Sequence, residues 1–282
     1  MRYKMICIDM DGTLLNRRKK ISDVNKKAIK EAHDMGVEIV VTTGRLYNNA
    51  AYYSQLLGVN SPVIAANGAI VIDQKTNDII YECPIPIEEC NKIFKILSKY
   101  RVLFQFNTNN TIYCNNWLSK ISTEFYMTKQ VYFEHLNIEY ENVQSKEIWK
   151  DIFKKEEGYM AKCIVISAAK STMMSIRNEI NKIPNIVSFA SGSHSLEINY
   201  KNVSKGNAIK ALIEKYEIDI KDVICIGDNE NDISMIKMAG LGVAMGNAIP
   251  EVKKVADYIT DTNENDGVAK VINKFILCNK EI

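Results

Sequence analysis

The sequence predicts an α/β protein whose parallel sheet is interrupted by an inserted α+β domain. Short apolar runs alternate with helix-period segments near both ends of the chain, as parallel strands and their crossover helices do. Between those ends, helices are mixed with hairpins over roughly 100 residues, an ordinary domain size. A stiff stretch at 83–86 holds two of the five prolines. We therefore expect core segments at 1–82 and 191–282 and an insert at 83–190.

The first core segment contains short apolar runs that end at polar or glycine-containing turns, which is typical of buried strands. The expected strands are residues 5–8, 38–42, 62–66, 69–73 and 79–82. A polar turn separates the last two, which indicates a hairpin. Ser22 is expected to cap a helix that ends at Gly36, and a second helix is expected over 47–57.

The insert shows both helical and hairpin patterns. The expected helices are 87–100, 145–155 and 171–183, and the expected strands are 102–106, 111–115, 160–167 and 186–190. Residues 117–142 give no readable pattern, and the return to the core is expected near 191–193.

From residue 195 the α/β alternation resumes, and Ser204 is expected to cap a helix that runs to Tyr216. The expected strands of this second core segment are 196–199, 223–226, 241–245 and 258–260, and its further helices are 232–239, 250–256 and 268–277.

Composition argues against nucleic acid or membrane partners. Lys and Arg number 36 and Asp and Glu 34, so the formal charge is only +2. No apolar run approaches the roughly 18 residues that span a bilayer, and the chain enters its first strand at once, so we expect no signal peptide. The seven cysteines form no metal-binding spacing, which favours reduced thiols in a cytoplasmic protein.

An acidic pair follows the first strand. Asp9 and Asp11 are separated by one residue, so an extended backbone places both on one side. Ligands of open α/β sheets bind at the carboxyl ends of the strands, where this pair is expected. A solvated acidic turn would show the same local pattern.

Further polar groups follow the other expected strands or begin the helices of the core: Thr43, Lys205, Asp228, Asn231 and Asp232. Alone, each has a simpler interpretation as a turn residue, a surface lysine or a helix cap. Together they fit phosphoryl transfer. Carboxylates such as Asp9 and Asp228 suit Mg²⁺, and a carboxylate can also act as a nucleophile. A lysine and a hydroxyl can hold phosphoryl oxygens, while Asp11 can move protons.

The sequence resembles the haloacid dehalogenase superfamily. D-M-D-G-T-L-L, T-T-G-R, S-K-G-N-A and G-D-N-E-N-D-I-S-M look like its four motifs, in the right order. Residues 226–246, N-G-A after the third strand, and N-D-G-V-A near the C-terminus are similar to the Cof-type subfamily (class IIB). The resemblance covers both core segments well and the insert only by its position and size.

This resemblance implies a Rossmann-like core with a C2-type cap. It implies that Asp9 is the nucleophile and Asp11 the general acid and base. Mg²⁺ would be bound by Asp9, the backbone carbonyl of Asp11 and Asp228, with Asp232 supporting them. The phosphate- or substrate-binding residues would be Thr43, Gly44, Arg45, Asn67, Lys205 and Asn231. For Arg45, an ion pair between core and cap is an equally weighted alternative.

Members of this family are mainly phosphatases of small phosphorylated metabolites, such as sugar phosphates or phosphorylated cofactors. We accordingly expect a Mg²⁺-dependent phosphatase that forms an aspartyl-phosphate, as a monomer or weak dimer. A phosphotransferase or phosphomutase with the same site is one alternative. A phosphate-binding protein without activity is another. A receiver domain would use a similar residue set, but it would be shorter and have no insert. His194, Trp117 and Trp149 are interpreted as structural.

Overall fold

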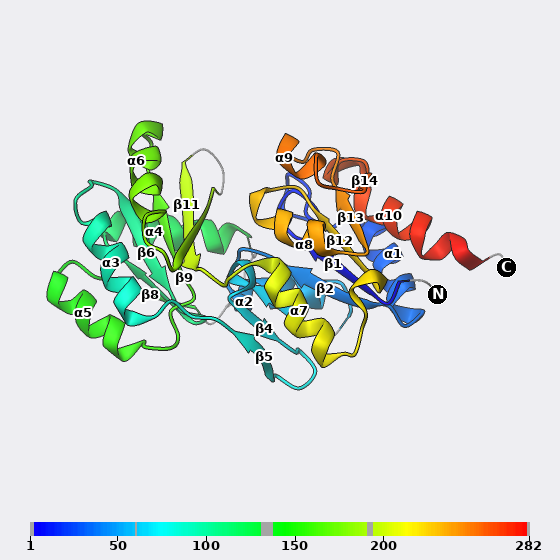
Figure 1. Ribbon diagram of the computed structural model, residues 1–282, viewed down its shortest axis with the longest axis horizontal. Helices are drawn as coiled ribbons and strands as arrows, with labels where there is room; N and C mark the ends of the chain where they lie inside the picture. The colour runs from blue at the N-terminus through cyan, green and yellow to red at the C-terminus, as the bar shows by residue number, and fades with distance from the viewer. Residues whose placement is uncertain (1–2, 60, 131–137, 191–193, 281–282) are drawn as a thin grey trace. The chain divides into compact units, whose positions relative to one another are not determined.

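The computed structural model describes residues 3–59, 61–130, 138–190 and 194–280. The chain forms two compact units (Figure 1). The larger unit combines Met1–Glu82 with Ser204–Ile282, and the smaller unit is Cys83–Val203. The larger unit is therefore built from two segments that are distant in the sequence.

The larger unit contains an eight-stranded sheet in the order β14-β13-β12-β1-β2-β3-β4-β5. Its strands from β14 to β3 are parallel, and β4 and β5 continue the edge as an antiparallel hairpin. The bounds are β1 Met5–Asp9, β2 Glu38–Thr42, β3 Val63–Ala65, β4 Ile70–Ile72, β5 Ile79–Glu82, β12 Val223–Gly227, β13 Leu241–Ala244 and β14 Tyr258–Ile259. The expected α/β class and the expected hairpin are confirmed.

Strand β1 is fully buried because parallel strands cover both of its edges. Ile8 pairs with Val41 of β2 on one side and with Ile226 of β12 on the other. A strand enclosed in this way needs a continuous apolar run rather than alternation, which explains the sequence Met-Ile-Cys-Ile before Asp9.

Two helices of the larger unit begin at capping serines. The hydroxyl of Ser22 accepts a hydrogen bond from the backbone of Asn25, and that of Ser204 accepts one from Asn207. Both expected caps are confirmed. The helices are α1 Asp23–Asp34, α2 Tyr47–Leu56, α7 Lys205–Lys215, α8 Ile233–Met238, α9 Pro250–Lys253 and α10 Gly267–Phe275.

The smaller unit contains a six-stranded sheet in the order β10-β11-β9-β6-β7-β8. Its strands are β6 Leu103–Asn107, β7 Thr111–Cys114, β8 Glu139–Asn142, β9 Lys162–Ile166, β10 Ile186–Ala190 and β11 Ser195–Tyr200. Its helices are α3 Ile87–Leu97, α4 Trp117–Gln130, α5 Lys146–Lys155 and α6 Lys170–Ile180. Strands β6 and β7 form the expected hairpin.

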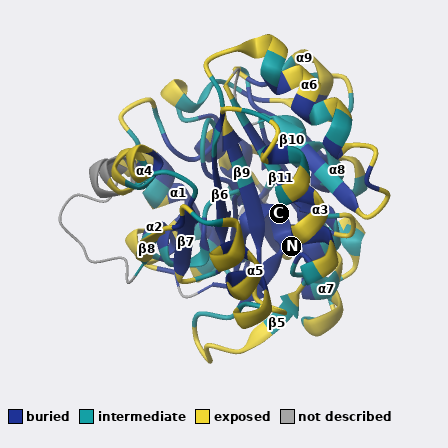
Figure 2. Ribbon diagram, turned by 90° about the vertical axis from the view of Figure 1, so that its left-hand side faces the viewer, coloured by how far each residue is buried: buried dark blue, intermediate teal, exposed yellow. Residues whose placement is uncertain are grey.

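The core of the smaller unit is aromatic. Trp149 lies 5.4 Å from Phe106 and 5.6 Å from Phe104 and Phe153, measured between ring centroids. Strand β6 is mostly buried and α5 has both buried and exposed residues (Figure 2), and Trp149 is among the buried ones. Trp149 is therefore a core residue of the smaller unit.

The second domain boundary predicted from the sequence is wrong. Residues 196–199 were assigned to the core sheet, but β11 pairs antiparallel with both β10 and β9 of the smaller sheet. The chain consequently returns to the larger unit at Ser204 rather than at 191. The expected linker at 191–193 lies outside the described residues. Residues 117–142, for which the sequence gave no readable pattern, contain α4 and β8.

Within the described part of the chain, no helix is long and apolar enough to cross a membrane.

Candidate active site

Three neighbouring strands of the core sheet end at polar residues. Asp9 is the last residue of β1, Thr43 follows β2, and Asp228 follows β12. These strands are adjacent and parallel, so their carboxyl ends lie at the same edge of the sheet. The structure thus brings together groups that are more than 200 residues apart in the sequence.

Lys205 joins two of the acidic residues. It is the first residue of α7, and its side chain is completely buried. Its Nζ lies 2.5 Å from Oδ1 of Asp9 and 2.6 Å from Oδ1 of Asp232. Burial acts to lower the pKa of Lys205, but the charges of Asp232 and Asp9 outweigh it and raise that pKa. Lys205 is therefore a permanent buried cation.

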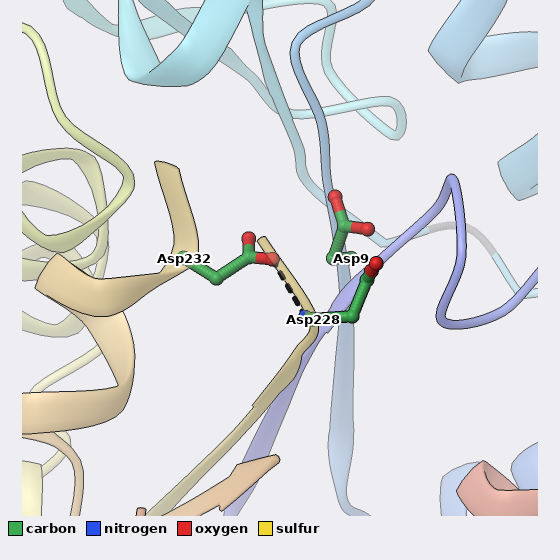
Figure 3. A group of neighbouring side chains, drawn as sticks. All are labelled: Asp9, Asp228 and Asp232. Carbon is green, nitrogen blue, oxygen red and sulfur yellow. Dashed lines mark hydrogen bonds between the residues drawn. The ribbon is translucent and has the colours of Figure 1, made fainter. Parts of the chain in front are cut away.

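Asp232 fixes the turn that follows β12. Its Oδ2 accepts a hydrogen bond from the backbone nitrogen of Asp228 at 2.8 Å (Figure 3). It also accepts one from the backbone nitrogen of Asn229 at 2.9 Å. A Cβ on Gly227 would lie 2.5 Å from Cβ and Cγ of Asp232, so only glycine allows this close approach. Both oxygens of Asp232 thus have protein donors.

The side chain of Asp228 is held by a residue near the N-terminus of the chain. Its Oδ1 accepts a 2.8 Å hydrogen bond from the hydroxyl of Thr13. A Cβ on Gly12 would lie 2.4 Å from Oδ2 of Asp228, and Gly12 also has a positive φ of 88°. The glycine after the acidic pair therefore makes room for Asp228.

Asp9, Asp228 and Asp232 form a compact acidic group, with one ligand atom of each within 4.8 Å of the others (Figure 3). Burial, followed by the charge of Asp232, raises the pKa of Asp9 well above its usual value. The same two causes raise the pKa of Asp228 to about 7. Lys205 offsets part of this repulsion, and a further cation beside Asp9 and Asp228 would favour the ionised forms of these two carboxylates.

A divalent metal fits this group. Asp9 and Asp228 each have one carboxylate oxygen, Oδ2, that forms no hydrogen bond with the described residues. Hard oxygen donors with high negative charge suit Mg²⁺. The carboxylate of Asp11 is not part of this group.

The carboxylate of Asp11 is held by two cations. Arg45 donates from Nε to Oδ2 and from Nη2 to Oδ1, both at 2.7 Å, and Lys19 Nζ lies 2.6 Å from Oδ1. Burial acts to raise the pKa of Asp11, but Arg45 and then Lys19 outweigh it and hold that pKa well below its usual range. Arg45 thus forms an ion pair with Asp11 within the larger unit.

Two asparagines connect the remaining segments of the site. Nδ2 of Asn231 donates a 2.9 Å hydrogen bond to Oδ1 of Asn67. The backbone nitrogen of Asn67 donates to the carbonyl of Thr43, which is buried. Gly44 lies directly after Thr43, in the same loop. The structure therefore places all the expected site residues in the larger unit, where Asp11 and Arg45 bind each other and the acidic group consists of Asp9, Asp228 and Asp232.

Several residues that support the site were not expected from the sequence. Thr13 belongs to the first motif, so its position beside the two aspartates could have pointed to it. Lys19 and Tyr53 have no comparable local signal. Tyr53 reaches the site from α2: its ring lies 5.0 Å from Cζ of Arg45, and its hydroxyl donates to the carbonyl of Lys19 at 3.3 Å.

Comparison with known proteins agrees with this geometry. A family model described as haloacid dehalogenase-like hydrolase matches residues 6–272. The 5-amino-6-(5-phospho-D-ribitylamino)uracil phosphatase YcsE of Bacillus subtilis is 34% identical, over 97% of this chain and 96% of the relative. The putative phosphatase YxeH of the same organism is 32% identical, over 98% and 99%.

Solved structures show the same fold. A haloacid dehalogenase-like hydrolase from B. subtilis superposes with a TM-score of 0.83 at 27% identity, covering 97% of this chain and all of the other. A similar hydrolase from Bacteroides thetaiotaomicron gives a TM-score of 0.81 at 28% identity, with 97% and 100% coverage.

Proposed function

Because this chain belongs to the haloacid dehalogenase-like hydrolases and is a phosphatase, we propose that it uses Mg²⁺ and an aspartyl-phosphate to hydrolyse small phosphorylated metabolites. The observation that supports this proposal most directly is the buried contact between Lys205 and Asp9. It places a permanent cation beside a carboxylate at the carboxyl end of a central strand, as phosphoryl transfer to that carboxylate requires.

In the proposed reaction, a carboxylate oxygen of Asp9 forms a bond to phosphorus while the bond between phosphorus and the leaving oxygen breaks. For this step Asp11 is protonated, unlike in the structure, where Arg45 and Lys19 stabilise its carboxylate form, and it donates that proton to the leaving oxygen. It then accepts a proton from the water that hydrolyses the acyl phosphate, which releases phosphate and restores Asp9. The same side chain serves as acid and then as base.

The other site residues bind and orient the phosphoryl group. Lys205 neutralises charge on its oxygens, and the hydroxyl of Thr43 donates to one of them. Gly44 offers its backbone, and Asn67 and Asn231 hold each other in place beside Thr43. Arg45 acts through Asp11, its partner in the structure.

Mg²⁺ would be held by Asp9, Asp228 and the backbone carbonyl of Asp11. Asp232 would orient the turn that presents Asp228. When bound, the metal ion would stabilise the negative charge that develops on the phosphoryl oxygens. The unengaged Oδ2 atoms of Asp9 and Asp228 support this assignment.

The substrate is proposed to be a phosphorylated cofactor precursor or sugar phosphate. Relatives from B. subtilis at 34%, 28% and 27% identity are named as phosphatases of 5-amino-6-(5-phospho-D-ribitylamino)uracil, a uracil with a phosphorylated ribityl chain. We also propose that Cys83–Val203 is the C2-type cap. The seven cysteines are free thiols, which supports a cytoplasmic location.

A hydrolysis screen with a matched variant tests the proposed function. Phosphate release is measured on p-nitrophenyl phosphate and on a panel of sugar phosphates and phosphorylated polyols, with Mg²⁺ and with EDTA. We expect activity that EDTA abolishes, and we expect Asp9→Asn to be inactive. Activity of Asp9→Asn equal to that of the wild type would exclude the mechanism. Transfer to excess acceptor sugar without phosphate release would indicate a phosphotransferase.

A further inference from the structure

We propose that Gly68 is a positioning residue for Lys205. Gly68 ends the turn Ala66–Gly68, which follows β3 and packs directly against the peptide group that joins Ser204 to Lys205. This contact sets the place of the Lys205 ammonium group in the site. The inference rests on the proposed function, in which Lys205 neutralises charge on the phosphoryl oxygens. Gly68 acts through Lys205 rather than on the substrate.

The first argument is the closeness of the two backbones. A Cβ on Gly68 would lie 2.3 Å from the carbonyl oxygen of Ser204 and 2.6 Å from its carbonyl carbon. It would also lie 3.0 Å from the backbone nitrogen of Lys205. These are backbone atoms, which cannot turn aside as the end of a flexible side chain can. A side chain at position 68 would therefore push the turn and the start of α7 apart.

The second argument is that the start of α7 is held by other contacts. The carbonyl oxygen of Ser204 accepts the hydrogen bond of the Ala208 nitrogen at 3.1 Å, in the first turn of the helix. A Cβ on Gly206 would lie 2.9 Å from the carbonyl oxygen of Ser234 in α8, so these two helices also touch. The backbone of Lys205 lies between these two close contacts along the chain. A displacement at Ser204 therefore reaches Lys205 directly.

The third argument is the conformation of the turn. Its φ angles are 49° at Ala66, 62° at Asn67 and 98° at Gly68, and all three residues are buried. Residues with a side chain rarely adopt such angles, which persist where the surrounding structure imposes them. The nitrogen of Ala66 donates to the carbonyl of Arg45 at 2.8 Å, and that of Asn67 to the carbonyl of Thr43 at 3.0 Å. The turn is thus fixed to the loop that carries Thr43.

The turn therefore joins the segments that carry three of the expected phosphate-binding side chains. The backbone of Asn67 binds the loop of Thr43, and its side chain accepts a hydrogen bond from Asn231. Gly68 packs against the peptide group before Lys205. These segments are far apart in the sequence, so their arrangement needs a common support. The turn supplies it, and its contact with α7 depends on the absence of a side chain.

The experiment compares Gly68→Ala with the matched control Gly36→Ala. Gly36 has a φ of 88°, close to that of Gly68, but nothing lies within 4 Å of a Cβ placed there. The control therefore carries similar backbone strain without the collision. We would measure kcat/KM on p-nitrophenyl phosphate with Mg²⁺, and the dissociation constant of inorganic phosphate by calorimetric titration with Mg²⁺.

For Gly68→Ala, we expect kcat/KM to fall about 100-fold, because a displacement of about 1 Å can have this effect. The phosphate dissociation constant should rise about tenfold, as the weakening of a hydrogen bond between charged groups would produce. Gly36→Ala should keep both quantities within about twofold of the wild type. A purely structural role would lower the melting temperature without changing the phosphate affinity of the folded molecules. Equal phosphate dissociation constants in the two variants would overturn the inference.

A second variant keeps the test valid if Gly68→Ala does not fold. Ala66→Gly adds no atom and relieves the strain of a positive φ, so it should keep the melting temperature of the wild type. It also frees the turn to take other conformations, so the phosphate dissociation constant should still rise, by about threefold. An unchanged constant would then overturn the inference. A wild-type protein without phosphatase activity would instead overturn the proposed function, and this inference with it.

Discussion

Asp232 holds Asp228 by its backbone: Oδ2 of Asp232 accepts the hydrogen bond of the Asp228 nitrogen at 2.8 Å. This contact leaves the side chain of Asp228 directed to Thr13 and to the acidic group. The two aspartates therefore have separate tasks, since one shapes the turn and the other presents a carboxylate from it.

Replacing Asp232 by alanine should strongly destabilise the larger unit. Lys205 would lose one of its two buried carboxylate partners, and two backbone nitrogens would lose their acceptor. We expect a loss of about 3 kcal/mol in the free energy of unfolding, measured with urea. Asp34→Ala removes an exposed ion pair with Lys30 and should cost less than about 1 kcal/mol. Equal losses would mean that the buried contacts of Asp232 do not stabilise the fold.

Replacing Gly12 by alanine should damage the site as well as the turn. Gly12 and Gly36 share a φ of 88°, but a Cβ would collide with Asp228 only at Gly12, since nothing lies within 4 Å at Gly36. Both variants should lose about 1 kcal/mol from backbone strain. Gly12→Ala alone should also raise the Mg²⁺ concentration needed for half-maximal activity. If Gly36→Ala raises it equally, the collision with Asp228 is not the cause.

Replacing Thr13 by valine should weaken metal binding while preserving the side-chain shape. The hydroxyl of Thr13 orients Asp228 through a 2.8 Å hydrogen bond, and groups that orient metal ligands typically affect metal affinity. We expect about a tenfold higher Mg²⁺ concentration at half-maximal phosphatase activity. Thr13→Ser keeps the hydroxyl and should stay near the wild type. A Mg²⁺ requirement that is the same in both variants would contradict this role.

The two tryptophans should differ sharply in their effect on stability. Trp149 is 2% exposed within the aromatic core of the smaller unit, whereas Trp117 at the start of α4 is 54% exposed. Trp149→Ala should cost about 3–5 kcal/mol of unfolding free energy. Trp117→Ala should cost less than about 0.5 kcal/mol. Urea unfolding followed by circular dichroism measures both, and a large loss in Trp117→Ala would contradict the observed exposure.

Much of the larger unit could be predicted from the sequence because its signals are local. The apolar run before Asp9 marks a buried strand, and Ser22 and Ser204 cap helices where expected. The polar strand ends could be placed together because parallel strands align their carboxyl ends. These predictions needed only the order of the elements along the chain.

Other features depend on tertiary pairing and could not be read locally. The apolar pattern of β11 is the same whichever sheet it joins, so the boundary at Ser204 appears only in its pairing with β9. Lys19 looks like any lysine of a basic loop, and its contact with Asp11 exists only because the turn takes a left-handed conformation. The sequence pointed to Arg45 as a site residue, but it did not predict the ion pair of Arg45 with Asp11.

The insertion also constrains how the protein is made. Strand β1 has β12 on one side, so its edge stays open until residues 223–227 have left the ribosome. Cys83–Val203 is continuous in the sequence and has its own core, so it can fold during synthesis. At that stage the first 82 residues still lack the second segment of the larger unit, which starts at Ser204. During that interval the apolar edge of β1 is exposed to aggregation, and chaperones that shield strand edges would act there.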